Sequence, residues 1–254
     1  MTLLAYALAL LIGLALGLLG GGGSILTIPV LHHVMGFSFA QAVPMSLVVV
    51  GITSGFGAIS HWREGNVRLR TAFQVGVPAI LGAVLGASLG PQVRDGIRLT
   101  VFGIVLLGAA LVMYRGRVTP PDPAPRDWPF ASRPLIFMDL IGASVGLLTG
   151  FVGVGGGFVY VPALTLLVGL PIKHAVGTSL VLILLSCAAG LVGYLGNPAL
   201  TQLDWRVVAL FTGLALIGAV AGSRLTHFVP QERLRHGFAA FLLILGLVVL
   251  LVRR

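Results

Sequence analysis

Two glycine-rich segments hold the residues of this chain whose types and spacing suit the binding of a small anion. They are Gly20–Leu31, GGGGSILTIPVL, and Gly153–Leu164, GVGGGFVYVPAL. Glycine lets the backbone approach a ligand closely, and a helix that starts there presents unpaired N–H groups and about half a positive charge. Such helix starts bind anions. We therefore expect an anion-binding turn in each segment.

Side chains around the two segments can add hydrogen-bond donors for an oxyanion. The candidate substrate-binding residues are Gly21, Gly22, Gly23, Ser24, Thr27, Ser46, Gly155, Gly156, Gly157, Tyr160, Thr178 and Ser179. A second group, which titrates near neutral pH or lies close to an apolar block, is a candidate for gating or coupling. It comprises Gln41, His174, His32 and His33. Two alternatives stay open: the glycines serve only close helix packing, and the hydroxyls bond their own helices.

The composition places these segments in a membrane protein. Of the 254 residues, 57% are hydrophobic and only 9% are charged, whereas about a quarter of the residues of a soluble domain are charged. The net charge of +9 comes from basic residues in the links between apolar blocks, which is typical of topology-setting loops and not of nucleic-acid binding. A single cysteine excludes an intrachain disulfide. We expect an all-α polytopic membrane protein.

The chain contains an internal repeat, in which the second half follows the first with the same order of glycines and prolines. The matched pairs are Gly13 with Gly146, Gly17 with Gly150, Gly20 with Gly153, Pro29 with Pro162, Ser46 with Ser179 and, after a slip of a few residues, Gly82 and Gly86 with Gly218 and Gly222. This frame predicts a first membrane repeat over 1–114, a proline-rich cytoplasmic linker over 115–133 and a second membrane repeat over 134–254.

Each repeat is expected to hold an apolar arm, the glycine break, a short arm and three spanning helices. The short arm Ile25–Met35 would rise about 16 Å, about half of the bilayer core, so the break should lie at membrane depth. Pro29 and Pro162 are expected within about the first turn of the short arms, while the start of each short helix stays open by about four residues. The two arms form either a hairpin or one broken crossing. The larger share of loop arginines on one side favours the hairpin, which makes the repeats inverted and both termini extracellular or periplasmic.

Both glycine motifs, with the segments AVPMSLVVV and AVGTSLVLI that follow them, resemble the TauE/SafE family of sulfite-exporter-like permeases. The resemblance covers nearly the whole chain. It implies a multi-pass protein of the cell inner membrane that carries small sulfur-containing anions, such as sulfite or an organosulfonate like sulfoacetate. Half one has Pro44-Met45-Ser46 where half two has Gly177-Thr178-Ser179, so a site that uses the Thr-Ser pair would be asymmetric.

The features together predict a secondary transporter or exporter that works by alternating access, with the anion held at the two breaks near the midplane. A channel-like facilitator of small anions and a transporter of an unrelated anionic metabolite are the alternatives. No carboxylate falls inside a predicted span, which disfavours a cation carrier. Without a metal-protease or P-loop pattern we expect no enzyme, cofactor or metal. The expected partners are a small anion and the lipid bilayer, whereas the oligomeric state, direction and coupling ion stay open.

Overall fold

Helices are the only regular secondary structure among the residues that the structure, a computed structural model, describes. These are residues 2–20, 24–115, 135–152, 157–197, 200, 203–225 and 228–251. In chain order the helices are α1 (Thr2–Leu19), α2 (Ser24–Pro29), η1 (Val30–Val34), α3 (Phe39–Arg63), α4 (Leu69–Leu89), η2 (Gly90–Gln92), α5 (Asp95–Arg115), α6 (Leu135–Val152), α7 (Gly157–Pro162), η4 (Ala163–Leu167), α8 (Ile172–Gly193), α10 (Trp205–Leu225) and α11 (Gln231–Leu251). The predicted linker, apart from Arg115, lies outside the described residues.

Five of the described helices are long and apolar enough to cross a membrane: α3, α4, α5, α8 and α10. Their outer faces carry large apolar side chains such as Phe73, Leu81 and Ile217, each more than half exposed. The exposed aromatic residues Trp62 and Trp205 lie at span ends, where aromatic residues meet the membrane–water interface. The chain is therefore a multi-pass membrane protein.

The two short arms have the same irregular helix. In each, one and a half turns of α-helix end at a proline, and a π-helical turn follows. The expectation that Pro29 and Pro162 lie in the first turn is wrong, because each is the sixth residue of its α-helix. Proline has no N–H to donate, and the next turn compensates by bonding five residues back: Met35 N–H donates to Val30 O, at 3.1 Å.

The first arm of each half packs against a helix of the other half. A Cβ added to Gly13 would lie 1.9 Å from Ala215 O, and one added to Gly17 would lie 2.1 Å from Ala219 O. The backbones of α1 and α10 can approach so closely only because both positions are glycine. The residue numbers rise together along the contact, so α1 runs parallel to α10.

The same packing recurs between α6 and α4. Here an added Cβ at Gly146 would lie 2.1 Å from Ala79 O, and one at Gly150 would lie 2.0 Å from Ala83 O. These four residues are the repeat equivalents of those between α1 and α10. The matched glycines of the sequence are therefore contact points between the two halves.

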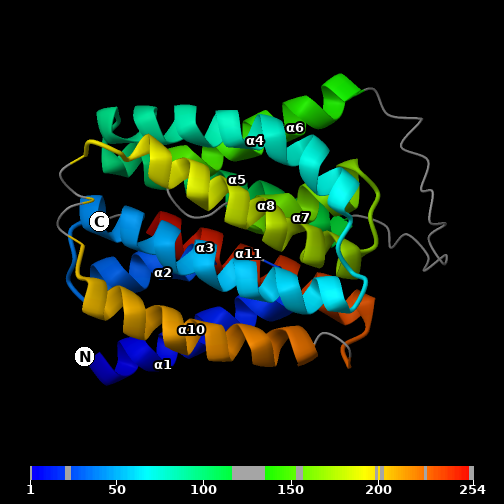
Figure 1. Cartoon of the computed structure of the whole chain (residues 1–254), viewed down its shortest axis with the longest axis horizontal. Coiled ribbons are helices and arrows are strands. Elements are labelled where there is room, and N and C mark those ends of the chain that lie inside the picture. Colours follow the sequence, from blue (N-terminus) through cyan, green and yellow to red (C-terminus); the bar gives the residue numbers. More distant parts are fainter. Residues whose placement is uncertain are drawn as a thin grey trace.

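The long helices α3 and α8 cross at the centre in opposite directions. Gly51 faces Cys187, whereas Gly57, further along α3, faces Leu180. Because α10 turns back from α8, it runs in the direction of α3, and so does its parallel neighbour α1 (Figure 1). The segment of α2 and η1 must therefore bring the chain back to the side from which α1 starts.

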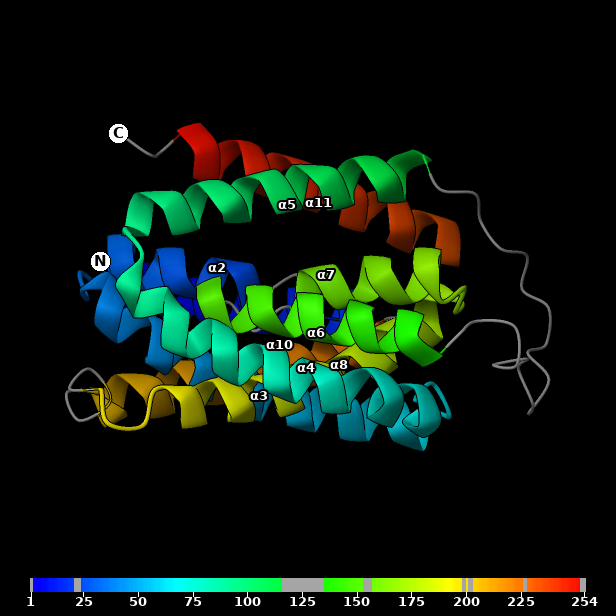
Figure 2. The same cartoon turned by 90° about the horizontal axis from the view of Figure 1, so that it is seen from above.

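The short arms lie in the interior of the bundle. In the view from above, α5 and α11 form an outer layer, and α2 and α7 lie between that layer and the helices α3, α4, α8 and α10 (Figure 2). Contacts of α2 with α3, of α7 with α5 and α8, and of α2 with α7 agree with this arrangement. The short helices that follow the two glycine breaks thus lie inside the protein and not toward lipid.

Candidate functional site

The first break is attached to the start of α8. Gly20, which follows α1, has a φ of +66°, a left-handed conformation that glycine adopts without strain. Its carbonyl accepts a hydrogen bond of 2.6 Å from the Ser179 hydroxyl. An added Cβ on Gly20 would lie 2.7 Å from Val176 Cα. Gly21, Gly22 and Gly23 lie outside the described residues, but the residue before them is held on α8.

The neighbouring residues of α8 pack against the link between α3 and α4. The Thr178 hydroxyl accepts a bond of 3.0 Å from the Arg68 backbone N–H. A Cβ on Gly177 would lie 2.6 Å from Asn66 O, so this position admits only glycine. Thr178 and Ser179 therefore have structural partners in this conformation, and their contact with substrate stays a prediction.

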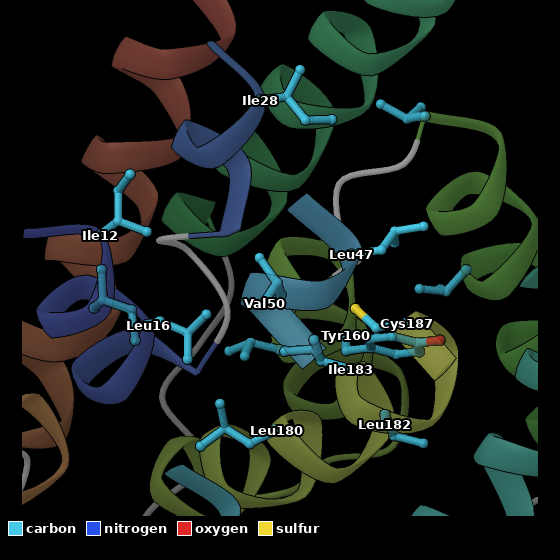
Figure 3. Packing of buried hydrophobic residues seen from close by; sticks show 14 of the residues in the cluster. Ile12, Leu16, Ile28, Leu47, Val50, Tyr160, Leu180, Leu182, Ile183 and Cys187 are labelled. Carbon is cyan, nitrogen blue, oxygen red and sulfur yellow. The ribbon is translucent and has the colours of Figure 1, made fainter. Parts of the chain in front are cut away.

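The second break is followed by Gly157, the first residue of α7; Gly155 and Gly156 lie outside the described residues. Tyr160 of α7 is fully buried, beside Cys187 and Ile183 of α8 (Figure 3). Its hydroxyl lies 2.5 Å from Ser186 Oγ. Sequence reasoning missed Ser186, although the repeat offset pairs it with another hydroxyl residue of α3 and could have singled it out.

The first half holds buried hydroxyls that have no such partner. Thr27 on α2 and Ser46 on α3 are both fully buried, and neither hydroxyl has a hydrogen-bond partner among the residues that the structure describes. Ser24, the first residue of α2, is also fully buried. An unpaired buried hydroxyl costs free energy unless a ligand or water completes it. The hydroxyls of Thr27 and Ser46 can therefore still donate to a ligand, and their contact with an anion stays a prediction.

Arg98, at the start of α5, is a buried cation that the sequence suggested only as a loop charge. It is 3% exposed, and its Nε donates a 2.9 Å bond to Phe151 O in the last turn of α6. The guanidinium lies 3.5 Å from the Tyr194 hydroxyl and stacks over the Phe39 ring. The permanent positive charge of Arg98 therefore lies against the last turn of α6, the helix that precedes the second break in the chain.

The four gating or coupling candidates have different surroundings. Gln41 and Ser38 form a capping box at the start of α3, and the His32 ring donates a 2.7 Å bond to Phe37 O. His33 is exposed. His174 is half-buried at the start of α8, near Arg68. The structure gives Gln41 and His32 local structural partners, and the gating role of all four stays a prediction.

We expect Ser179→Ala to destabilise the folded protein by about 1–3 kcal/mol, because the buried Gly20 carbonyl loses its donor. Ser46→Ala, at the equivalent position of the first repeat, is the matched control and should leave the free energy of unfolding nearly unchanged. Thermal unfolding of both purified variants checks this. Equal melting temperatures would contradict the role of Ser179 in holding the first break.

Comparison with known proteins agrees with this architecture. The family model described as "Sulfite exporter TauE/SafE" matches residues 5–249. The chain belongs to this family. It is 34% identical over 244 residues to a "Probable membrane transporter protein" of Xylella fastidiosa strain 9a5c, covering 95% of this chain and 89% of that protein. It is 27% identical over 241 residues to the "Probable membrane transporter protein YdhB" of Bacillus subtilis, covering 94% and 96%.

No solved structure matches the chain. The resemblance to the TauE/SafE family drawn from the glycine motifs is confirmed, and the expected function in membrane transport agrees with the names of the relatives. A transporter moves its solute without transforming it, so no catalytic centre is required of the residues described above.

Proposed function

We propose that this TauE/SafE protein is a secondary transporter or exporter of small sulfur-containing anions, sulfite or an organosulfonate such as sulfoacetate, and that it works by alternating access. One observation carries the proposal: two half-length helices, α2 and α7, each start directly after a glycine break and touch each other inside the bundle. Broken helices that meet in the interior are where secondary transporters bind their substrates.

An inverted repeat supplies the two alternating states of this proposal. The arm α1 is parallel to α10 and the arm α6 is parallel to α4, and α10 and α4 run in opposite directions (Figure 1). The equivalent arms α1 and α6 therefore also run in opposite directions. In line with this, α2 lies toward the side where α1 begins and α7 toward the opposite side. These directions support the hairpin arrangement of the arms, with both termini on one side of the membrane, and the distribution of arginines favours the periplasm for that side.

The chemistry of the interior suits an anion. Backbone N–H groups at a helix start carry partial positive charge, and the buried hydroxyls of Thr27 and Ser46 can donate to oxyanions. The buried guanidinium of Arg98 adds positive potential near the second break. In the low-dielectric interior these groups favour a negative solute far more than they would in water.

Binding of sulfite, sulfoacetate, taurine and sulfate to the purified protein tests the proposal by thermal shift. A selective shift with sulfite or sulfoacetate is expected, and its loss in Gly22→Leu and Gly155→Leu variants that stay folded would support a shared site at the two breaks. A shift that both variants retain would move the site elsewhere. No shift with any of the four anions would overturn the substrate class.

Thr27→Val and Ser46→Ala test the contribution of the two buried hydroxyls. Because neither hydroxyl has a partner within the described part of the chain, removing it should leave the melting temperature unchanged or slightly raised. Loss of one donor to a charged ligand costs about 1.5–3 kcal/mol, so anion affinity should fall about tenfold or more. Thr53→Val, whose hydroxyl bonds Val49 O at 2.6 Å, is the control that should keep its affinity.

A further inference from the structure

A buried histidine touches the last turn of α1, just before the first break. His61 is fully buried in the last turn of α3, and its Nε2 lies 3.2 Å from Gly17 O. A carbonyl oxygen only accepts hydrogen bonds, so Nε2 must carry the hydrogen and donate it. The tautomer of the neutral ring is thereby set, with the lone pair on Nδ1.

The other ring nitrogen faces a carboxylate. His61 Nδ1 lies 3.8 Å from Glu64 Oε2, and the same carboxylate accepts a 3.2 Å bond from the Asn66 side chain. With a neutral ring, the Nδ1 lone pair would face the negative oxygen. A proton on Nδ1 turns this contact into an ion pair inside the protein. The geometry therefore holds a place for one proton.

The His61–Glu64 pair is partly open to water on one side and packs against α1 and α8 on the other. The Glu64 side chain is 19% exposed whereas the His61 side chain is 0% exposed, so a proton can reach the ring from the α3–α4 link. His61 also packs against α8: a Cβ added at Gly177 would lie only 3.0 Å from the Cβ of His61. A change of charge on His61 thus acts on both α1 and α8, the two helices that hold the first break.

The second repeat has a permanent charge at the matching place. Tyr194 occupies the position equivalent to His61, and the Arg98 guanidinium beside it donates to Phe151 O at the end of α6. Both arms therefore end against a buried donor. Near the end of α6 the donor is always cationic, whereas near the end of α1 it is cationic only when a proton is bound.

We propose that His61 and Glu64 form a proton-binding site that couples proton movement to anion transport. The inference rests on the proposed function and names its coupling ion. The elements packed against α3 carry further charged or titratable residues: α8 and α10 both contact α3, with Lys173 and His174 at the start of α8 and Arg224 in the last turn of α10, and Arg63 and Arg68 flank the pair in the chain. The proposed place of the proton is Nδ1 of His61, the ring nitrogen that faces Glu64 Oε2.

The test uses the full chain in proteoliposomes with a pH-sensitive dye inside and sulfite or sulfoacetate added outside, with protein-free liposomes subtracted. The wild type should move about one proton with each anion, and His61→Gln and Glu64→Gln should lower that ratio about tenfold. Exchange of labelled anion at equal pH on both sides should persist in both variants, since glutamine at position 61 can still donate to Gly17 O. His236→Gln, at an exposed histidine of α11, is the control that should behave as wild type.

The outcomes separate the two proposals. Anion exchange by the wild type without proton movement, or a wild-type proton ratio in His61→Gln, would overturn the proton site and leave the transporter standing. Absence of exchange with both anions would overturn the proposed function and the proton site with it. If His61→Gln fails to fold, Glu64→Gln, at a partly exposed position, tests the proton site by the same two measurements, the proton-to-anion ratio and the anion exchange at equal pH.

Discussion

Gly218→Ala is expected to destabilise the protein by about 3 kcal/mol or more, one of the largest effects of a single methyl group in this chain. The added Cβ would lie 2.1 Å from Leu10 O, and this atom belongs to the backbone of α1, which cannot move aside as a flexible side chain would. The helices α1 and α10 must separate, and overpacking of this kind costs about 1–3 kcal/mol, occasionally more.

Gly213→Ala, on the same helix, is the matched control. No atom lies within 4 Å of a Cβ added there, so alanine should be neutral or slightly stabilising through its better helix propensity. Gly82→Ala, the repeat equivalent of Gly218→Ala, should repeat its effect, since its Cβ would lie 2.2 Å from Ala143 O. Thermal unfolding and gel filtration of the three variants check this, and equal stability of Gly218→Ala and Gly213→Ala would contradict the close helix contact.

Gly20→Ala is expected to abolish most transport, with a fall in the exchange rate of about tenfold or more. An alanine at φ +66° is strained by about 1–2 kcal/mol, and its Cβ would lie 2.9 Å from Ser179 Oγ. To relieve the backbone strain and the close contact with Ser179, the turn at Gly20 that leads into Gly21–Ser24 must shift. A displacement of about 1 Å at a site that must fit its ligand can cost about a hundredfold in rate.

Gly36→Ala separates the effect of backbone strain from the effect of displacing the first break. Gly36 also has a left-handed φ, +80°, but no atom lies within 4 Å of an added Cβ. The backbone strain should therefore lower its melting temperature while anion exchange in proteoliposomes stays near the wild-type rate. If Gly36→Ala loses exchange to the same degree as Gly20→Ala, the backbone strain and not the position of the first break is responsible.

The order of the helices and the repeat could be read from the sequence because both depend on local composition. Apolar runs predicted the spans, and the shared frame of glycines predicted two equivalent halves. The exact helix bounds are harder to predict: α3 begins at Phe39 and ends at Arg63, so that it includes polar residues at both ends of its apolar run. The Ser38–Gln41 capping box and the final polar turn extend a helix without adding to its hydrophobicity.

The candidate site was predictable only in part. Glycine and hydroxyl residues near the breaks stand out in the sequence, and Thr27, Ser46 and Tyr160 are all fully buried in the structure. The partners of Tyr160 and of Ser179, however, come from other segments of the chain: Tyr160 meets Ser186, and Ser179 meets Gly20. A hydrogen bond between residues so far apart in the chain leaves no local pattern in composition or periodicity.

The sequence by itself determined that this is an all-helical membrane protein with a repeated glycine break, and it identified the family, because hydropathy and the glycine frame are properties of the chain itself. Tertiary structure decided which glycines meet which backbone, with Gly13 packing on α10 and Gly146 on α4. It also decided that His61 and Arg98, which the sequence places at the ends of spans, are buried against α1 and α6. Burial of a charge or an imidazole depends on what packs over it, and only the assembled helices determine that.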